Sequence, residues 1–325
     1  MKANFKSIAI LFFGITTLVS CSKDDEAPAK NYIPSAASFM AIKEQGVRSQ
    51  TQNFSATAGS GLITLTSSHG VQISFNGNNL TKNGNPVTGA IDVKFIEIFD
   101  KGTMLATNKS TMGRMFDGNQ SVLISGGEFY LEASQGGVQL VSTGSIQLEV
   151  PSSLTDGIDS EMTFWQGNVA DPENIVWEKP RGPQEGAVGF NTAGNNYNML
   201  FGNFGWTNID RFYSDPRPKT QILATVPLGY NDTNSAVYLS VDGEGQSQLA
   251  KFDTYNPTTL QFSEHYGQIP IGLECHIIFA TEDNGLWRYG IKGVTTVANA
   301  VYSFTLAETV VGTEAQMVAA INAIQ

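Results

Sequence analysis

The side chains that could do chemistry in this 325-residue chain are few and widely spaced. The three histidines, His69, His265 and His276, do not have the spacing of a metal site. His276 follows Cys275 directly, and adjacent side chains of a strand face opposite sides, so these two residues do not readily share one ion. The chain also has no HExxH, CxxC, EF-hand, Walker or GxSxG motif. These observations predict no metal, no cofactor and no catalytic residue, and they predict Cys275 to be a small buried apolar residue.

Two groups of acidic residues are the remaining candidates for catalysis. Asp156, Asp159 and Glu161 lie close together, and Asp242 and Glu244 flank a glycine. Paired carboxylates serve glycosidases and also bind calcium. Both groups stand in short turn-like stretches, where acidic side chains mostly face water. The sequence therefore favours solvated acids, and it leaves open a hydrolase whose carboxylate pair has no readable motif.

One tryptophan with polar neighbours gives a candidate binding face. In a strand, Trp206, Asn208 and Asp210 point to one side. An exposed tryptophan ring can stack on the face of a sugar, while an amide and a carboxylate beside it bind hydroxyl groups. These three residues are therefore the predicted ligand-binding residues. The alternative is a tryptophan that covers a sheet edge, with Asp210 and Arg211 in structural ion pairs.

The elements that must position these side chains are predicted to form an all-β fold, with two β-sandwich-like domains and a short C-terminal helix. Apolar and polar residues alternate in short runs, which is the pattern of strands with one buried face. The runs are 62–66, 71–75, 91–95, 128–133, 146–150, 221–228 and 237–241, and residues 269–281 predict one long strand. Asn83-Gly84 and Asn284-Gly285 predict hairpin turns, because such turns need positive φ.

Two stretches predict burial on particular faces. At Ile96 and Ile98 the apolar residues of the strand at 91–98 change to its other face, which predicts a bulge or burial on both sides. The C-terminus is the only stretch that is predicted to be helical, and Thr313 can cap it. The apolar residues on one face of this helix are Met317, Ile321 and Ile324.

The N-terminus carries a localisation signal. Lys2 and Lys6 accompany the apolar run 8–19, which has the length of a signal-peptide core and is too short to span a bilayer. Residues 18–21, LVSC, resemble a bacterial lipobox, which implies that Cys21 is acylated and becomes the first residue after cleavage. Acyl chains hold a protein at a membrane with about 0.8 kcal/mol per buried methylene. The alternative is an ordinary signal peptide with an incidental cysteine.

The residues after the cysteine predict the membrane face to which the protein is exported. Ser22, Lys23, Asp24, Asp25 and Glu26 resemble the export signal of Bacteroidetes surface lipoproteins, which implies an outward-facing position in the outer membrane. A periplasm-facing position is the alternative, and a charged stretch of this kind also suits a solvated tether. Removal of residues 1–20 takes away two lysines and lowers the formal net charge from −11 to −13. Such an acidic protein repels phosphate backbones, which excludes nucleic acid as an expected partner.

Part of the chain resembles known domains. Residues 61–65, 70–75 and 87–98 resemble the start of a ZU5-type β-sandwich. Residues 84–89, 100–104, 126–130 and 204–213 resemble segments of uncharacterised Bacteroidetes lipoproteins. The likeness covers about residues 55–150 and implies a β-sandwich. The chain has Ser74-Phe75-Asn76 where ZU5 domains usually have Ile-Pro-Pro, and it lacks the His-Phe-Ser motif at which some relatives cleave themselves, so no autoproteolysis is expected.

The predicted organisation has five parts. Residues 1–20 are a lipoprotein signal peptide, and residues 21–37 are the lipidated cysteine and a flexible acidic tether. Residues 38–179 are a ZU5-like β-sandwich domain, residues 180–187 a linker, and residues 188–325 a second β-sandwich-like domain with the C-terminal helix.

The expected function follows from the localisation and the fold class. The chain is predicted to be a lipid-anchored cell-surface lipoprotein that acts as a non-enzymatic binding module. Its expected partners are the outer membrane, through the lipid, and a glycan or a surface protein. Two alternatives remain open: a surface glycan hydrolase with an unrecognised carboxylate pair, and a structural spacer or adhesin.

Overall fold

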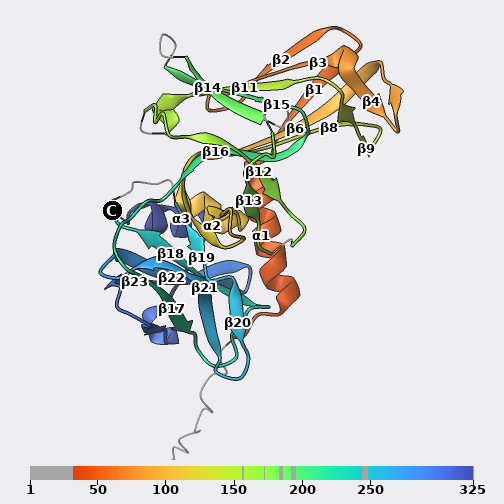
Figure 1. The fold of residues 1–325 in the computed structure, drawn as a ribbon. Coiled ribbons are helices and arrows are strands. Elements are labelled where there is room, and N and C mark those ends of the chain that lie inside the picture. Colours follow the sequence, from red (N-terminus) through yellow and green to blue (C-terminus); the bar gives the residue numbers. More distant parts are fainter. Residues whose placement is uncertain are drawn as a thin grey trace, which may run out of the picture. The chain divides into compact units, whose positions relative to one another are not determined.

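Two β-sandwiches lie on either side of a layer of helices, as Figure 1 shows. The computed structural model describes residues 32–155, 157–171, 173–182, 186–191, 195–243 and 248–324. Residues 33–325 form one compact unit. The predicted signal peptide, the predicted lipid-anchor residue Cys21 and the predicted export signal Ser22 to Glu26 lie outside the described residues. The all-β sandwich prediction with a short C-terminal helix is confirmed.

The first sandwich consists of two mainly antiparallel sheets, one of which also contains a parallel pair of strands, and a small appended sheet. The larger sheet has the order β1 (Gln52–Ala58), β6 (Gly89–Ile98), β8 (Gln120–Gln135), β16 (Gly205–Phe212), β12 (Thr163–Asn168), β13 (Val176–Glu178) and β7 (Met112–Arg114), and β9 (Val138–Gln139) pairs with β8. The facing sheet has the order β14 (Gly186–Asn191), β15 (Asn196–Phe201), β11 (Ile146–Pro151), β3 (Gln72–Asn76) and β2 (Leu62–Thr66). The small sheet is β10 (Val141–Ser142), β4 (Leu80–Lys82) and β5 (Asn85–Pro86). Alternate residues of the two large sheets, such as Phe95, Phe129 and Leu148, form one buried core between them.

The second sandwich is smaller and follows in the chain. One sheet has the order β20 (Thr254–Asn256), β21 (Gln261–Pro270), β17 (Lys219–Thr225) and β24 (Val301–Ser303). The other has the order β19 (Ala250–Lys251), β18 (Ser235–Val241), β22 (Glu274–Asp283), β23 (Leu286–Thr295) and β25 (Val310–Gly312). Cys275 is fully buried in their common core, as predicted.

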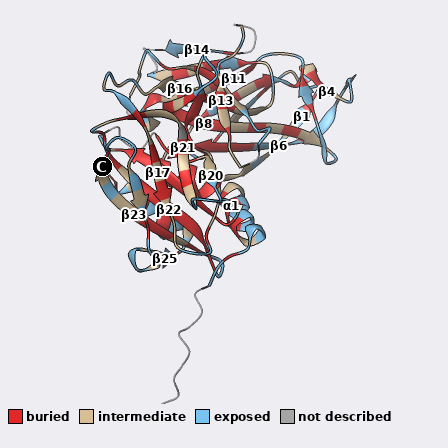
Figure 2. Cartoon of the chain, turned by 60° about the horizontal axis from the view of Figure 1, so that its bottom comes forward, coloured by how far each residue is buried: buried red, intermediate tan, exposed pale blue. Residues whose placement is uncertain are grey.

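The helix layer fills the space between the sandwiches. It consists of α1 (Ala36–Gln50), α2 (Lys101–Thr107) and α3 (Glu314–Asn322). The side chains of Ser35, Asp100 and Thr313 cap the three helix N-termini. Helix α1 contacts β6 of the first sandwich and β22 of the second, and α3 contacts α2 and β23. Figure 2 shows the buried residues running through the strands, with the outer side of α1 exposed.

Some of the turns, strands and buried faces predicted from local sequence patterns are confirmed, and others are wrong. The turns at Asn83-Gly84 and Asn284-Gly285 have positive φ at both residues, as predicted. Burial of β6 on both faces is also confirmed, because the helix layer covers the second face near Ile96. The single strand predicted at 269–281 is wrong: β21 ends at Pro270, and a turn with Gly272 at φ +78° separates it from β22. Short 3₁₀ turns occur at Gly77–Asn79, Ser152–Leu154 and Leu306–Glu308.

The prediction that only the C-terminus is helical is also wrong. Helix α1 has its buried residues at Phe39, Ile42, Lys43 and Gly46, which is a helical spacing, but it lies in the stretch that was assigned to the tether and the first domain. All seven residues of α2 are buried, so no polar face marks it in the sequence. Among the described residues no helix is long and apolar enough to cross a membrane.

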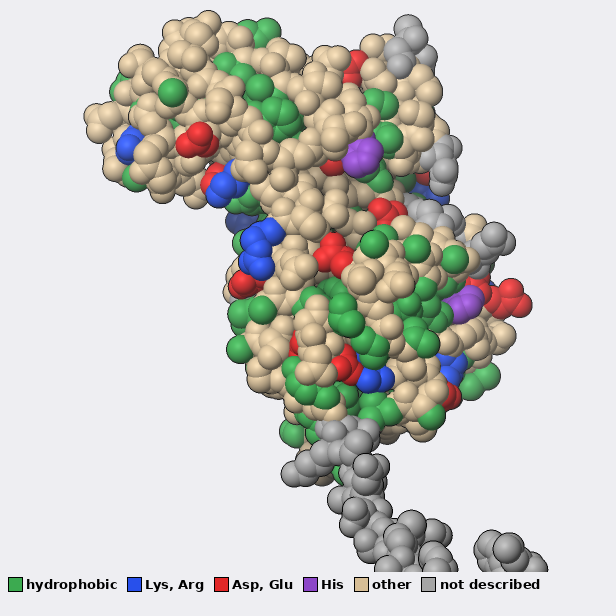
Figure 3. Space-filling view, turned by 180° about the vertical axis from the view of Figure 1, so that it is seen from behind, with side chains coloured by type: hydrophobic (Ala, Val, Ile, Leu, Met, Phe, Trp, Pro, Cys, Tyr) green, Lys and Arg blue, Asp and Glu red, His purple; other side chains and the backbone are tan. Residues whose placement is uncertain are grey.

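The strand pairing crosses the linker predicted at 180–187. Strands β14 and β15 pair with each other, and β15 also pairs with β11 from the first half of the chain. Strand β16 pairs with both β8 and β12. The sheets therefore change from the first sandwich to the second between Phe212 and Lys219. On the face seen in Figure 3, apolar side chains are exposed over the second sandwich among scattered charged ones.

Candidate functional site

A groove of about 530 Å³ lies where the first sandwich meets the helix layer. Strands β6, β8 and β16, the end of α1 and the residue after the C-cap of α2 contribute to it. Its lining residues are Val47, Thr51, Lys94, Ile96, Lys109, Tyr130, Glu132, Val169 and Trp206.

An aromatic pair dominates this groove. Trp206 of β16 lies directly opposite Tyr130 of β8 in the antiparallel register, so the two side chains meet on the same face of the sheet. Their ring centroids are 5.3 Å apart. The edge of Trp177 packs against Trp206 from a third strand, with ring centroids 6.5 Å apart. Both Trp206 and Tyr130 remain half-buried, so part of the pair faces the groove.

Charged side chains surround the aromatic pair. The ammonium of Lys109 lies 5.2 Å from the centroid of the Trp206 ring, which is a cation–π contact. Burial lowers the pKa of Lys109, although Glu128 and then Glu173 oppose this shift. The Tyr130 hydroxyl donates to Oε2 of Glu132 at 2.7 Å, and burial together with this carboxylate raises the pKa of Tyr130. Lys94 Nζ lies 3.3 Å from the other oxygen, Oε1, of Glu132. The groove thus combines a flat apolar surface with donors and acceptors at its edges.

The structure separates the three predicted ligand-binding residues. Trp206 lines the groove, whereas Asn208 and Asp210 are fully buried and line none of the cavities described here. Asn208 Nδ2 donates to Asp210 Oδ2 at 2.6 Å, so the two polar residues do lie together. The alternation of a strand gives the side to which a residue points but does not show whether another layer covers that side. Arg211 pairs with Asp159, at 2.5 Å, rather than with Asp210.

Sequence reasoning did not find the partners of Trp206 in the groove. Glu128, Tyr130 and Glu132 alternate along β8 and share its helix-facing side, which is a signal in the sequence. Nothing local to β8 indicates that β16 pairs with it, because the paired residues are 74 to 89 positions apart in the chain. No pattern in the sequence around Lys109 indicates its contact with Trp206, because this contact depends on where the fold places the end of α2.

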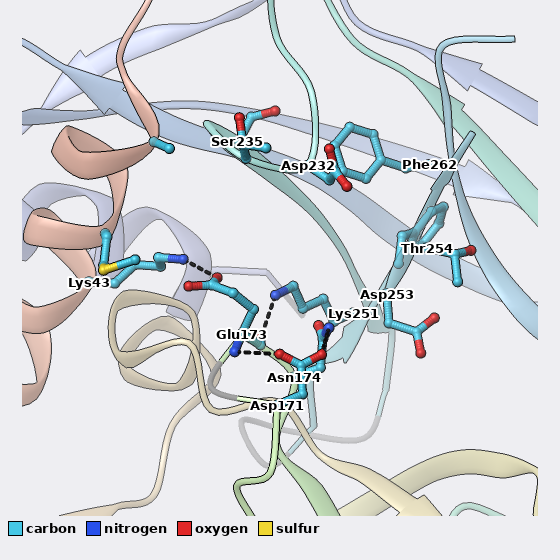
Figure 4. Close-up of a pocket in the computed structure, with 14 residues that line it drawn as sticks. Lys43, Asp171, Glu173, Asn174, Asp232, Ser235, Lys251, Asp253, Thr254 and Phe262 are labelled. Atoms are coloured by element: carbon cyan, nitrogen blue, oxygen red, sulfur yellow. Dashed lines mark hydrogen bonds and ion pairs between the residues drawn. The ribbon is translucent and has the colours of Figure 1, made fainter. Parts of the chain in front are cut away.

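A second cavity, of about 400 Å³, is drawn in Figure 4. It lies between α1, the segment around Glu173 and the strands β18 to β20. Lys43 forms an ion pair with the carboxylate of Glu173, and Lys251 donates to the main-chain oxygen of Glu173 at 2.5 Å and to Asn108 Oδ1 at 3.1 Å. Burial, followed by the charge of Lys43, lowers the pKa of Lys251 to about 8. Asp171, Glu173, Asp232 and Asp253 outnumber the two lysines of this cavity.

The other candidates from the sequence occupy ordinary surroundings. His69 Nδ1 lies 2.8 Å from Glu97 Oε1, and His276 Nδ1 lies 2.7 Å from Asp242 Oδ1. Asp156, Glu244 and the side chain of His265 lie outside the described residues. Within the described part of the chain, no group of three or more His, Cys, Asp or Glu side chains could hold a metal ion.

Comparison with known proteins does not assign the chain to a family. No protein-family model matches the chain, and no curated protein matches it at a significant level. The likeness to ZU5 domains and to Bacteroidetes lipoproteins therefore stays a prediction from the sequence.

Proposed function

We propose that this chain is a lipid-anchored surface lipoprotein that acts as a non-enzymatic binding module, and that the groove at Trp206 holds its ligand. The anchor and the outward position rest on the lipobox-like LVSC and on the acidic residues that follow Cys21. The observation that carries the binding role is the half-buried pair of Trp206 and Tyr130, which is held in a groove with polar edges.

The chemistry of the groove favours a saccharide. The aromatic rings offer a flat surface for the C–H face of a sugar, while Lys94, Lys109 and Glu132 can bind hydroxyl or carboxylate groups at the edge of the same ring. A volume of about 530 Å³ lies within the range of small-molecule sites. An aromatic or aliphatic side chain of a partner protein is the second ligand that such a surface accepts.

A surface glycan hydrolase is the alternative from another class. The cavity of Figure 4 supports it, because several carboxylates line one concave site there, as glycoside hydrolysis requires. The ion pair of Lys43 with Glu173 and the hydrogen bonds of Lys251 favour a structural role for the same residues.

A glycan-binding experiment tests the proposal. We expect the purified protein to bind members of a glycan array, and Trp206→Ala to weaken this binding at least about tenfold, which corresponds to about 1.4 kcal/mol. Phe116→Ala is the matched control, because Phe116 is a fully exposed aromatic residue outside the groove. Binding that survives Trp206→Ala would place the ligand elsewhere, and the release of shorter saccharides would establish the hydrolase.

A further inference from the structure

Lys109 reaches the groove from the end of helix α2. Asn108, the C-cap of α2, has a left-handed backbone with φ of 54°, and the Lys109 N–H donates to the main-chain oxygen of Met104 at 2.8 Å. Such contacts are typical of helix C-termini, and they fix the backbone from which the Lys109 side chain extends. The ammonium of this side chain lies 5.2 Å from the centroid of the Trp206 ring. The fold therefore places a positive group beside the aromatic pair.

The Lys109 ammonium differs from the other lysines of the groove and of the cavity in Figure 4. Lys94 and Lys43 each form an ion pair with a glutamate, and Lys251 donates to a main-chain oxygen. Within the part of the chain that the structure describes, the Lys109 ammonium donates to no acceptor and forms no ion pair. An ammonium carries three donors, so Lys109 has hydrogen bonds left for a ligand.

Two acidic residues act on the charge of Lys109, and neither of them pairs with it. Glu128 is fully buried, and burial, followed by the charge of Asp210, raises the pKa of Glu128 well above its usual range, although Lys109 opposes this shift. Burial therefore favours the neutral form of Glu128. Glu173 already forms an ion pair with Lys43. The positive charge of Lys109 thus remains available to an anionic group of a ligand.

The charge of the groove lining is opposite in sign to the charge of the whole protein. Among the described lining residues, Lys94 and Lys109 are positive and only Glu132 is negative, whereas the whole chain has a formal net charge of −11. Charges in solution are screened over about 8 Å at physiological ionic strength, so the nearest groups decide which ligand charge the groove attracts. Because Lys94 already pairs with Glu132, Lys109 provides the attraction.

We propose that the groove binds acidic saccharides in preference to neutral ones, and that Lys109 binds their acid group, a carboxylate or a sulfate. This inference rests on the proposed function of the groove as a saccharide site. A neutral sugar that stacks where the ammonium lies over Trp206 has to displace the ammonium and loses the cation–π contact. An acidic sugar keeps this contact and adds a charge-assisted hydrogen bond, while its ring contacts Tyr130 and the open part of Trp206.

A glycan array with neutral, uronic-acid and sulfated saccharides tests this preference. We expect the purified protein to bind acidic members at least about tenfold more tightly than neutral members of the same size, which corresponds to about 1.4 kcal/mol. Lys109→Met keeps an unbranched side chain without the charge and should lose the preference, whereas Lys109→Arg keeps the charge and should retain it. The uronic-acid and sulfated members show which acid group the groove takes.

Lys179→Met is the matched control, because Lys179 lies 5.0 Å from the centroid of the Trp165 ring but does not line the groove. Circular dichroism checks that each variant is folded. Equal binding of neutral and acidic saccharides by the wild type, or an unchanged preference in Lys109→Met, would overturn the inference and leave the saccharide site in place. An array without any binding would overturn both. The wild-type comparison needs no variant, so it remains decisive even if Lys109→Met does not fold.

Discussion

Trp206 and Tyr130 are held from several sides before any ligand arrives. The two rings lie 5.3 Å apart across β16 and β8, Trp177 packs its edge on Trp206, and Lys109 lies over the same ring. Ordering a side chain on binding costs about 0.5–1.5 kcal/mol, so rings that are already fixed lose less on binding. At the residue scale, the groove therefore offers a preorganised surface.

Glu264 gives a prediction about pH at the same scale. It is 1% exposed in β21 and accepts from the main-chain N–H groups of Tyr266 and Gly267 at 3.1 Å each. Burial raises its pKa from 4.5 to about 7. The folded state thus holds this proton more tightly than the unfolded chain, and its contribution to stability is lost as the pH rises from about 4.5 to about 7. The loss amounts to at most about 3 kcal/mol.

Urea denaturation of the wild type and of Glu264→Gln at about pH 5 and about pH 8 checks this prediction. The variant should be less stable than the wild type at the lower pH, because its amide loses one acceptor, and the difference should shrink or reverse at the higher pH. Glu274→Gln, at an exposed position of β22, is the control. An equal difference between wild type and Glu264→Gln at both pH values would contradict the prediction.

The helices connect the sandwiches through close contacts. Asp100 caps α2 by accepting from Thr103 N at 2.8 Å, and it also accepts from the side-chain amide of Asn322, at the end of α3. Gly46 of α1 lies against α2 so closely that an added Cβ would be 2.3 Å from the main-chain oxygen of Ala106. At the element scale, the crossing of α1 and α2 therefore needs a residue without a side chain at position 46.

Gly46→Ala should destabilise the protein for this reason. In an exposed helix the change would stabilise by about 1 kcal/mol, because alanine is the better helix former. Here the clash is with backbone, which cannot rotate away, and overpacking of this kind costs about 1–3 kcal/mol. Thermal denaturation shows whether Gly46→Ala raises or lowers the stability of the protein. Gln45→Ala, on the exposed side of the same helix, should change the stability little. A more stable Gly46→Ala protein would show that the two helices do not cross this closely.

At the scale of the whole molecule, the helix layer belongs to both sandwiches. Its core includes Ile96 and Ile98 from the first sandwich and Tyr238, Ile278 and Trp287 from the second. Lys251 and Tyr238 from the second sandwich both donate to Asn108, the C-cap of α2. Neither sandwich can lose this layer without exposing apolar surface, so we infer that the two sandwiches unfold together.

Ile321→Ala tests this cooperativity. Ile321 of α3 is 0% exposed in the helix layer, and its truncation should cost about 2–5 kcal/mol. Hydrogen exchange should then accelerate by a similar factor in β8 of the first sandwich and β22 of the second. Faster exchange in only one of these strands would show that the sandwiches unfold independently.

Much of the local structure could be read from the sequence. Alternation along β3, β6 and β11, the Asn-Gly turns and the apolar face of α3 depend on residues a few positions apart, and all were predicted. Trp206 was also predicted as a site residue, because a large aromatic residue among polar neighbours is a local signal.

Only the tertiary structure decided which residues share a surface with Trp206. The sequence determined that Trp206, Asn208 and Asp210 point the same way, but the helix layer and the neighbouring strands leave only Trp206 at the groove and bury the other two. Tyr130 and Lys109 reach the ring through contacts between segments far apart in the chain. The pairing of β15 and β16 with strands before residue 180 is likewise non-local. Local patterns record the direction of a side chain, whereas burial depends on which distant element packs over it.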